Sequence, residues 1–294
     1  SIYLQRLKDK LGNRSNASSE VEFDDTFALL VGEEGRGIPA ILEMGVYTRF
    51  DCATGAAGIM HHCVAQAIHH ARHRSAFGKL LSDQPLMRNV LADLALECEA
   101  AIALALRLAR AFDSRQDETW SALQRLLTPV AKYWICKRAP LVGAEAMEVL
   151  GGNGYIEEGP IARRFRELPL NSIWEGSGNI MCLDLLRALS REPRTLEALV
   201  SLLHGSRGRD ARFDQYLAQL LKDLHGAGVG EASARILTER IALAAQAAIL
   251  LEGGAPVVAE AFIASRIVNG APGAFGVLPA ADYHAALIDR ALGA

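Results

Sequence analysis

The sequence predicts a mainly α-helical protein with a short β region at its N-terminal end. Alanine and leucine dominate the 294 residues, and aromatic residues make up only 6% of them, a composition that favours helix over sheet. Three long segments, 37–73, 84–113 and 117–150, carry apolar residues at i, i+3, i+4 and i+7, which is the pattern of amphipathic helices. Short polar breaks separate them, so we expect an antiparallel bundle.

The first part of the chain, residues 1–34, has a different pattern. Polar and apolar residues alternate around residues 21–25 (VEFDD), and the apolar run 27–32 (FALLVG) leads into a glycine-rich turn. These patterns predict one or two β-strands. So few strands cannot bury themselves as an independent domain, and the chain opens on Ser1 in the middle of a pattern. We therefore expect a remnant of a larger β-domain in a longer protein.

Further helices are expected beyond the three long ones. A glycine-rich loop (151–160) precedes a short basic helix (161–168), and a fourth helix begins near residue 180, where Ser177 or Asn179 can cap it. The pattern after Pro193 is again helical, and the segments expected to form helices are 194–205, 211–225, 230–252, 256–269 and 280–292. We therefore predict three parts, with the bundle at 35–191 and a second helical domain at 192–294.

Charge and composition exclude several classes of protein. The formal net charge of −3 gives no global basic field for nucleic acid or anionic membranes. No apolar run reaches the roughly 20 residues that span a bilayer, so no membrane partner is expected. The five cysteines are odd in number and form no CxxC pair, which indicates reduced thiols in a cytoplasmic protein.

Five histidines fall between Met60 and His73. His69 and His73 are four residues apart on one helical face, a spacing that can chelate a metal ion. No third ligand follows at a suitable spacing, so solvated or interface histidines are the preferred interpretation. We predict no metal site.

Four motifs in one order carry the strongest functional signal. They are Arg74-Ser-Ala-Phe77-Gly78, Leu150-Gly151-Gly152-Asn153-Gly154-Tyr155, Arg166-Glu167 and Trp174-Glu175-Gly176-Ser177. Each is weak alone, because a glycine pair after a helix is usually a C-cap and an acidic residue before glycine is common in turns. Together they resemble the C-terminal signature of the acyl-CoA dehydrogenase family, with matching spacing from about Gly12 to Ala188.

Within that family the chain is most similar to the AidB-type proteins of the bacterial adaptive response to DNA alkylation. The segment NSIWEGSGNIMCLDLLR (171–187) and the helical appendage after residue 190 carry this likeness. The resemblance implies the family's C-terminal four-helix bundle, preceded by the β remnant and followed by an extra C-terminal helical domain. It also implies FAD as cofactor, an acyl-CoA substrate and a homotetramer.

The resemblance also assigns roles near the substrate. Family members remove the α-proton of an acyl-CoA thioester while the β-hydrogen leaves as hydride to the flavin. The catalytic base maps to Glu175. Gly176 would let the backbone approach the thioester, where an N–H can stabilise the enolate-like oxygen, and Arg49 maps to an arginine near the acyl-CoA entrance. A short or branched acyl group, as in isovaleryl-CoA, is the substrate that the family suggests.

The residues that the resemblance assigns to FAD lie in three of the motifs. Arg74 and Phe77 map to residues that contact FAD across a subunit boundary, where the arginine fork suits a pyrophosphate. Gly151 and Gly152 map to a backbone turn that passes close to the cofactor. The remaining residues assigned to FAD lie in the turn that contains the base and at the start of the helix after it: Ile173, Trp174, Ser177 and Asn179. The chain departs from the family at Glu148 and Pro85, where glutamine is usual, and these departures affect the adenine-side contacts.

Two other functions remain open at this point. AidB-type proteins are associated with duplex DNA, and Arg207, Arg209 and Arg212 form a local basic cluster. From Glu192 onward, however, nine Lys/Arg stand against eleven Asp/Glu, a net charge of −2, which is unfavourable for binding phosphates. A purely structural helical protein is the other alternative, and it would tolerate substitution at Glu175.

Overall fold

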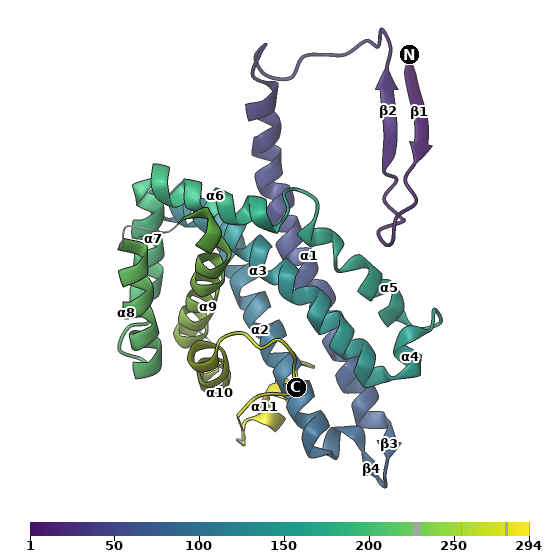
Figure 1. The fold of residues 1–294 in the computed structure, drawn as a ribbon, viewed down its shortest axis with the longest axis vertical. Coiled ribbons are helices and arrows are strands. Elements are labelled where there is room, and N and C mark those ends of the chain that lie inside the picture. The colour runs from purple at the N-terminus through teal and green to yellow at the C-terminus, as the bar shows by residue number, and fades with distance from the viewer. Residues whose placement is uncertain (226–229, 254, 280–281, 294) are drawn as a thin grey trace.

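The computed structural model describes residues 1–225, 230–253, 255–279 and 282–293, and it confirms the mainly α-helical fold (Figure 1). Three long helices run alongside one another: α1 (Gly37–His73), α2 (Pro85–Asp113) and α3 (Glu118–Leu150). Each begins and ends within one residue of the predicted segment.

Two local signals set the starts of α2 and α3. Pro85 occupies the first turn of α2, where its missing N–H costs nothing, and the Asp117 side chain accepts hydrogen bonds from Thr119 N (2.9 Å) and Trp120 N (3.1 Å).

The β region is a single antiparallel hairpin, β1 (Ile2–Leu7) and β2 (Ser19–Phe23), with Ile2 opposite Phe23. The prediction of strand structure at 27–32 was wrong, because no strand among the described residues pairs with this run. A second small hairpin, β3 (Ser75–Ala76) and β4 (Lys79–Leu80), forms in the polar break between α1 and α2. The predicted site residue Phe77 lies in its turn, and Arg74 directly precedes β3.

The rest of the described chain is helical. In order, the elements are α4 (Gly152–Tyr155), α5 (Pro160–Glu167), η2 (Leu170–Ser172), α6 (Gly178–Arg191), α7 (Pro193–His204), α8 (Ala211–His225), η3 (Glu231–Ser233), α9 (Ala234–Gly253), α10 (Pro256–Phe262), η4 (Ile263–Ile267) and α11 (His284–Arg290). α6 is the predicted fourth helix, and it runs across the long helices near one end of the bundle (Figure 1).

Two local predictions in this region need correction. The segment 151–160 was predicted as a loop, but one turn of helix, α4, forms directly after Gly151. Ser177 stands at the N-cap position of α6 without a side-chain capping bond. Asn179 does not cap the helix either, because its side-chain oxygen accepts a hydrogen bond from Arg235 Nε of α9 at 2.9 Å.

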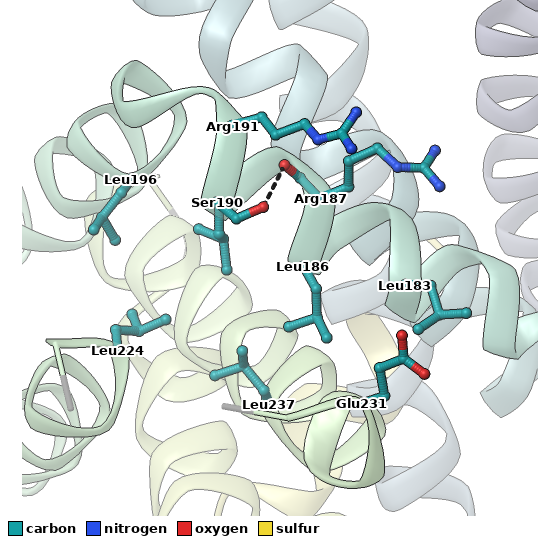
Figure 2. A pocket seen from close by; sticks show the side chains of 10 residues that line it. Leu183, Leu186, Arg187, Ser190, Arg191, Leu196, Leu224, Glu231 and Leu237 are labelled. Carbon is teal, nitrogen blue, oxygen red and sulfur yellow. Dashed lines mark hydrogen bonds between the residues drawn. The ribbon is translucent and has the colours of Figure 1, made fainter. Parts of the chain in front are cut away.

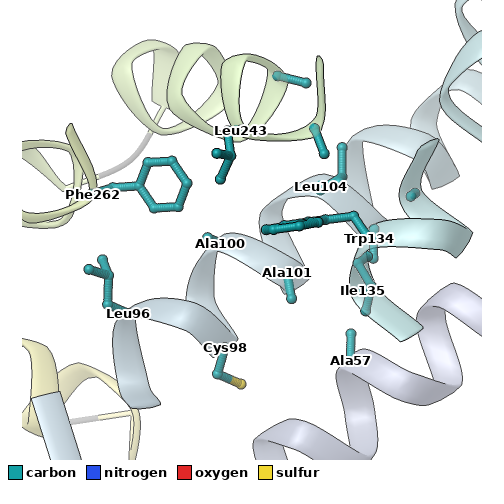
Figure 3. Packing of buried hydrophobic residues seen from close by; sticks show 14 of the residues in the cluster. Ala57, Leu96, Cys98, Ala100, Ala101, Leu104, Trp134, Ile135, Leu243 and Phe262 are labelled. Carbon is teal, nitrogen blue, oxygen red and sulfur yellow. The ribbon is translucent and has the colours of Figure 1, made fainter. Parts of the chain in front are cut away.

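One hydrophobic core joins the bundle to the later helices. Figure 3 shows Leu243 of α9 and Phe262 of α10 packed against α2, near Trp134 of α3. Small residues such as Ala100 let the helices approach closely. Trp134 Nε1 also donates a buried hydrogen bond to Gln246 Oε1 at 3.0 Å. The division of the chain at residue 191 remains a prediction.

A buried ionic cluster holds the C-terminal elements against the bundle. Arg266 of η4 is only 1% exposed and pairs with Asp93 and with Glu97, at 3.0 Å for Glu97. Arg138 of α3 pairs with Glu97 at 2.7 Å. Asp93 also accepts hydrogen bonds from the backbone N–H of Gly276 (2.9 Å) and of residue 277 (3.2 Å). Two cations therefore balance two carboxylates inside the protein.

All five cysteines are free and buried. Burial raises the pKa of the Cys98 and Cys136 thiols to about 12, so these thiols stay protonated and unreactive at neutral pH. Within the described residues, no helix combines the length and apolar character needed to cross a membrane.

Candidate active site

Glu175 lies in a strained turn between η2 and α6. Its φ of +58° is in the left-handed region, which side chains larger than glycine seldom adopt. Gly176 follows with a φ of +107°, and a Cβ there would come within 2.7 Å of Met181 Cε. Only glycine fits at position 176 without a shift of its neighbours. Strain of this kind is concentrated at functional sites.

The α1 helix holds the Glu175 side chain and backbone. Thr48 Oγ1 lies 2.7 Å from Glu175 Oε2 and 3.1 Å from the carbonyl oxygen of Gly45. A hydroxyl carries one hydrogen, so it donates to one of these two acceptors at a time. Arg49 Nε donates to the Glu175 carbonyl oxygen at 3.0 Å, and Asp184 of α6 pairs with Arg49 at 3.1 Å. The structure thus brings the predicted residues Arg49 and Glu175 into contact.

Lys132 of α3 supports the same turn from inside the protein. It is 1% exposed, and its ammonium group contacts backbone carbonyls on both sides of Glu175. The motifs indicated neither Lys132 nor Thr48. The sequence did contain a signal for Lys132, because a single lysine interrupts the apolar run from Pro129 to Cys136, and a lysine buried in such a run needs polar partners.

The other predicted residues of this turn surround Glu175. Trp174 is half-buried and donates from Nε1 to Asn171 Oδ1 at 3.0 Å. Ile173 and Ser177 are exposed. Asn179 is exposed as well, although Arg235 uses its side-chain oxygen. The turn therefore offers an exposed surface of mixed apolar and polar character beside the carboxylate.

The remaining predicted cofactor residues lie at the other end of the bundle. Arg74 is exposed at the end of α1, and Phe77, in the β3–β4 turn, is 98% exposed with a φ of +52°. Gly151 and Gly152 lie where α3 meets α4, at the same end of the bundle as β3 and β4 (Figure 1), and a Cβ on either glycine would meet nothing within 4 Å. The backbone turn is thus open to a ligand.

The two groups of residues do not meet within one chain. Thr48 and Arg74 mark their positions along α1, and the helix between them is roughly 38 Å long at a rise of about 1.5 Å per residue.

A pocket of about 280 Å³ lies beside the Glu175 turn, lined by Leu42, Val46, Arg49, Gln124, Arg125, Thr128, Pro129, Ile180, Leu183, Asp184 and Arg187. A larger pocket, of about 530 Å³, lies among α6, α7, α8 and α9. Figure 2 shows its leucines facing one another, with Arg187 and Arg191 at one side. None of the residues predicted from the motifs lines this larger pocket.

The three arginines predicted to contact DNA differ in their surroundings. Arg212 forms ion pairs with Asp210 and Glu260, both at 2.6 Å. Arg209 donates to the carbonyl oxygen of Leu251 at 2.6 Å. Within the part of the chain that the structure describes, only Arg207 of the three has a side chain without a polar partner. The cluster therefore presents little free positive charge to a phosphate backbone.

The histidines of α1 do not gather a metal-binding set among the described residues. The rings of His69 and His73 stack with their centroids 4.4 Å apart, and His73 Nδ1 lies 2.8 Å from the carbonyl oxygen of His69.

Known proteins resemble the chain in sequence and in fold. Residues 35–190 match the acyl-CoA dehydrogenase C-terminal domain. The chain is 48% identical over 262 residues to AidB of Escherichia coli (strain K12), a protein of the acyl-CoA dehydrogenase type, covering 89% of this chain and 48% of that protein. It is 32% identical over 197 residues to the mitochondrial short-chain specific acyl-CoA dehydrogenase of Bos taurus, covering 66% of this chain and 46% of the enzyme.

A solved structure is similar over the later helices as well. Caenorhabditis elegans ACDH-11 in complex with C11-CoA superposes with a TM-score of 0.78 at 26% identity, covering 90% of this chain and 48% of that one. The chain spans about half the length of the curated relatives it matches. The family match covers more than half of the chain and includes both groups of site residues; the chain belongs to the acyl-CoA dehydrogenase family.

Proposed function

We propose that the complete protein is an FAD-dependent acyl-CoA dehydrogenase of the AidB type, in which Glu175 removes the α-proton of a short or branched acyl-CoA. The observation that carries this proposal is the strained turn that presents the Glu175 carboxylate. A base must be held within hydrogen-bond reach of the proton that it removes. Thr48 and Arg49 hold Glu175 through its side chain and its backbone.

The turn also offers donors for the oxygen that becomes negative. Within the described chain, the backbone N–H groups of Glu175 and Gly176 donate to no acceptor. Fixed N–H groups of this kind stabilise an enolate-like oxygen as proton removal proceeds.

The Thr48 hydroxyl can hydrogen-bond to Glu175 both before and after the carboxylate takes up the proton. The hydroxyl donates to the ionised carboxylate, and after proton transfer it can accept from the carboxylic acid while donating to the Gly45 carbonyl.

The residues assigned to FAD fit a flavin nucleotide in chemistry and space. The exposed Arg74 can pair with a pyrophosphate, Phe77 offers an exposed ring, and the Gly151–Gly152 backbone leaves open space. When bound, FAD would supply the acceptor for the hydride that leaves the β-carbon. Because the two groups lie roughly 38 Å apart along α1, we propose that a second copy completes each site, in a homotetramer. Five buried free thiols suit a reducing compartment, so we place the protein in the cytoplasm.

This function can be tested on the complete protein, purified after expression. The purified protein is expected to show flavin absorbance and to release FAD on denaturation. Anaerobic addition of butyryl-CoA, isovaleryl-CoA or an 11-carbon acyl-CoA is expected to bleach that absorbance for at least one of them. Free CoA is the control and leaves the absorbance unchanged. A protein that holds no flavin after expression with excess riboflavin contradicts the proposal.

Replacing Thr48 with valine removes the hydroxyl but keeps the shape of the side chain. We expect kcat to fall by about ten- to a hundredfold, because a hydrogen bond to a charged group contributes about 1.5–3 kcal/mol. KM should change little, since Thr48 acts on the base. Thr54→Val is the matched control on α1, because the Thr54 hydroxyl bonds only to backbone carbonyls of its own helix. Equal kcat values for the two variants would remove Thr48 from the mechanism.

A further inference from the structure

We propose that Lys132 is a positioning residue that fixes the direction of the backbone N–H groups around Glu175, and so presets the site that binds the enolate-like oxygen. The inference rests on the proposed function, which names the reaction that this oxygen takes part in. It adds Lys132 of α3 to the residues that hold the Glu175 turn.

The contacts of Lys132 are confined to one short stretch of backbone. Its Nζ donates to the carbonyl oxygens of Asn171 (3.0 Å), Trp174 (2.9 Å) and Gly176 (2.8 Å). An ammonium group has three N–H donors and no acceptor, so these three carbonyls use its full capacity. A neutral amine has only two donors, and the complete set of contacts therefore requires the protonated form.

Burying the charged Lys132 side chain costs free energy, which indicates that this lysine has a specific role. Lys132 is 1% exposed, and burial lowers the pKa of its ammonium group because water no longer solvates the charge. Among the described residues, no carboxylate lies within 4.0 Å of its Nζ to compensate. An apolar side chain would fill the same space without this penalty. What it could not do is hold the three carbonyls.

Peptide geometry connects these carbonyls to the N–H groups on the other side of the turn. In a planar trans peptide, the C=O of one residue and the N–H of the next point in opposite directions. Holding the Trp174 carbonyl therefore orients the N–H of Glu175, and holding the Gly176 carbonyl orients the N–H of Ser177. Arg49 holds the peptide between them through the Glu175 carbonyl.

Three consecutive peptide units are thus held by cations at their carbonyl ends. Their three N–H groups, on Glu175, Gly176 and Ser177, donate to no acceptor within the described residues. Preorganised donors stabilise developing negative charge without a cost of reorientation during the reaction. Without Lys132, the strained φ angles at Glu175 and Gly176 can relax, and the donors turn away.

The test uses acetoacetyl-CoA, whose acidic α-carbon ionises to an enolate without turnover. Bound to the complete wild-type holoenzyme, it should ionise at a lower pH than in free solution, as measured by enolate absorbance. Lys132→Met is expected to raise that pH by about one to two units and to lower kcat by about 100-fold, with FAD content unchanged. Lys222→Met, an exposed lysine of α8, is the control and should behave as wild type.

A second variant covers the case in which Lys132→Met does not fold. Lys132→Gln keeps two N–H donors without the charge, and the same rise in ionisation pH is expected. The inference is overturned if either folded variant ionises acetoacetyl-CoA at the wild-type pH, or if neither variant folds, because Lys132 would then be purely structural. Failure of the proposed function looks different, because wild-type protein itself would then neither bleach with acyl-CoA nor ionise the ligand.

Discussion

Replacing Arg266 with methionine is expected to destabilise the protein by about 3–5 kcal/mol, because the substitution leaves buried carboxylates without their main cation. Asp93 is fully buried, Glu97 is 4% exposed, and both pair with Arg266. Arg138 alone would remain to balance them. The loss should also loosen η4 from α2, since Arg266 is the only side chain of η4 in this cluster among the described residues.

The measurement is urea-induced unfolding of the complete protein at one fixed concentration, because assembly contributes to apparent stability. Arg194→Met is the matched control. Arg194 also pairs with a glutamate, Glu118, but the two side chains are 67% and 76% exposed. An exposed pair of this kind contributes at most about 1 kcal/mol. Unfolding midpoints that are equal for the two variants would show that the buried cluster contributes no more than a surface ion pair.

The buried cluster also makes stability depend on pH. Burial alone would raise the pKa of Glu97, but the guanidinium groups of Arg266 and Arg138 outweigh burial and hold that pKa below its usual range. A carboxyl group with a lowered pKa stabilises the folded state at pH values above its unfolded pKa. That contribution is lost as the pH falls through the folded value. The wild-type protein should therefore lose stability in acid more steeply than Arg266→Met.

The long helices could be predicted from the sequence because each carries a helical pattern of apolar residues over most of its length. In α1, α2 and α3 the apolar period extends over many turns, and proline or aspartate marks the start of two of them. Residues 27–32 and 151–160 were harder to predict. An apolar run becomes a strand only if another strand pairs with it, and a single helical turn such as α4 leaves no periodic pattern to detect.

Some residues of the candidate site could be predicted from the sequence, and others could not. The motifs located Glu175, Arg49 and the residues of the turn, since these positions are neighbours in sequence or lie in family motifs. Thr48 and Lys132 were missed because their roles depend on tertiary contacts, across 127 residues for Thr48 and Glu175. The separation of Arg74 from Glu175 along α1 was likewise visible only in the fold.

Replacing Glu175 with glutamine should abolish nearly all turnover in the complete holoenzyme while preserving its ligands. The amide has almost the shape of the carboxyl group but cannot accept the α-proton. Removing a general base costs about 10²- to 10⁴-fold in rate, so kcat should fall by that factor. The Thr48 hydroxyl can still donate to the amide oxygen, and Arg49 and Lys132 bind backbone oxygens that the substitution leaves in place. The turn should therefore keep its conformation.

The decisive measurement separates binding from chemistry. Glu175→Gln should retain wild-type FAD content and bind acyl-CoA with an affinity within a few fold of wild type. Under anaerobic conditions, however, acyl-CoA should bleach its flavin about 10²- to 10⁴-fold more slowly than in the wild-type protein. Glu158→Gln, an exposed glutamate in the loop before α5, is the control and should bleach at the wild-type rate. If Glu175→Gln also bleached at that rate, the strained turn would not carry the base. If it lost FAD as well as rate, the carboxylate would contribute to binding rather than to proton removal.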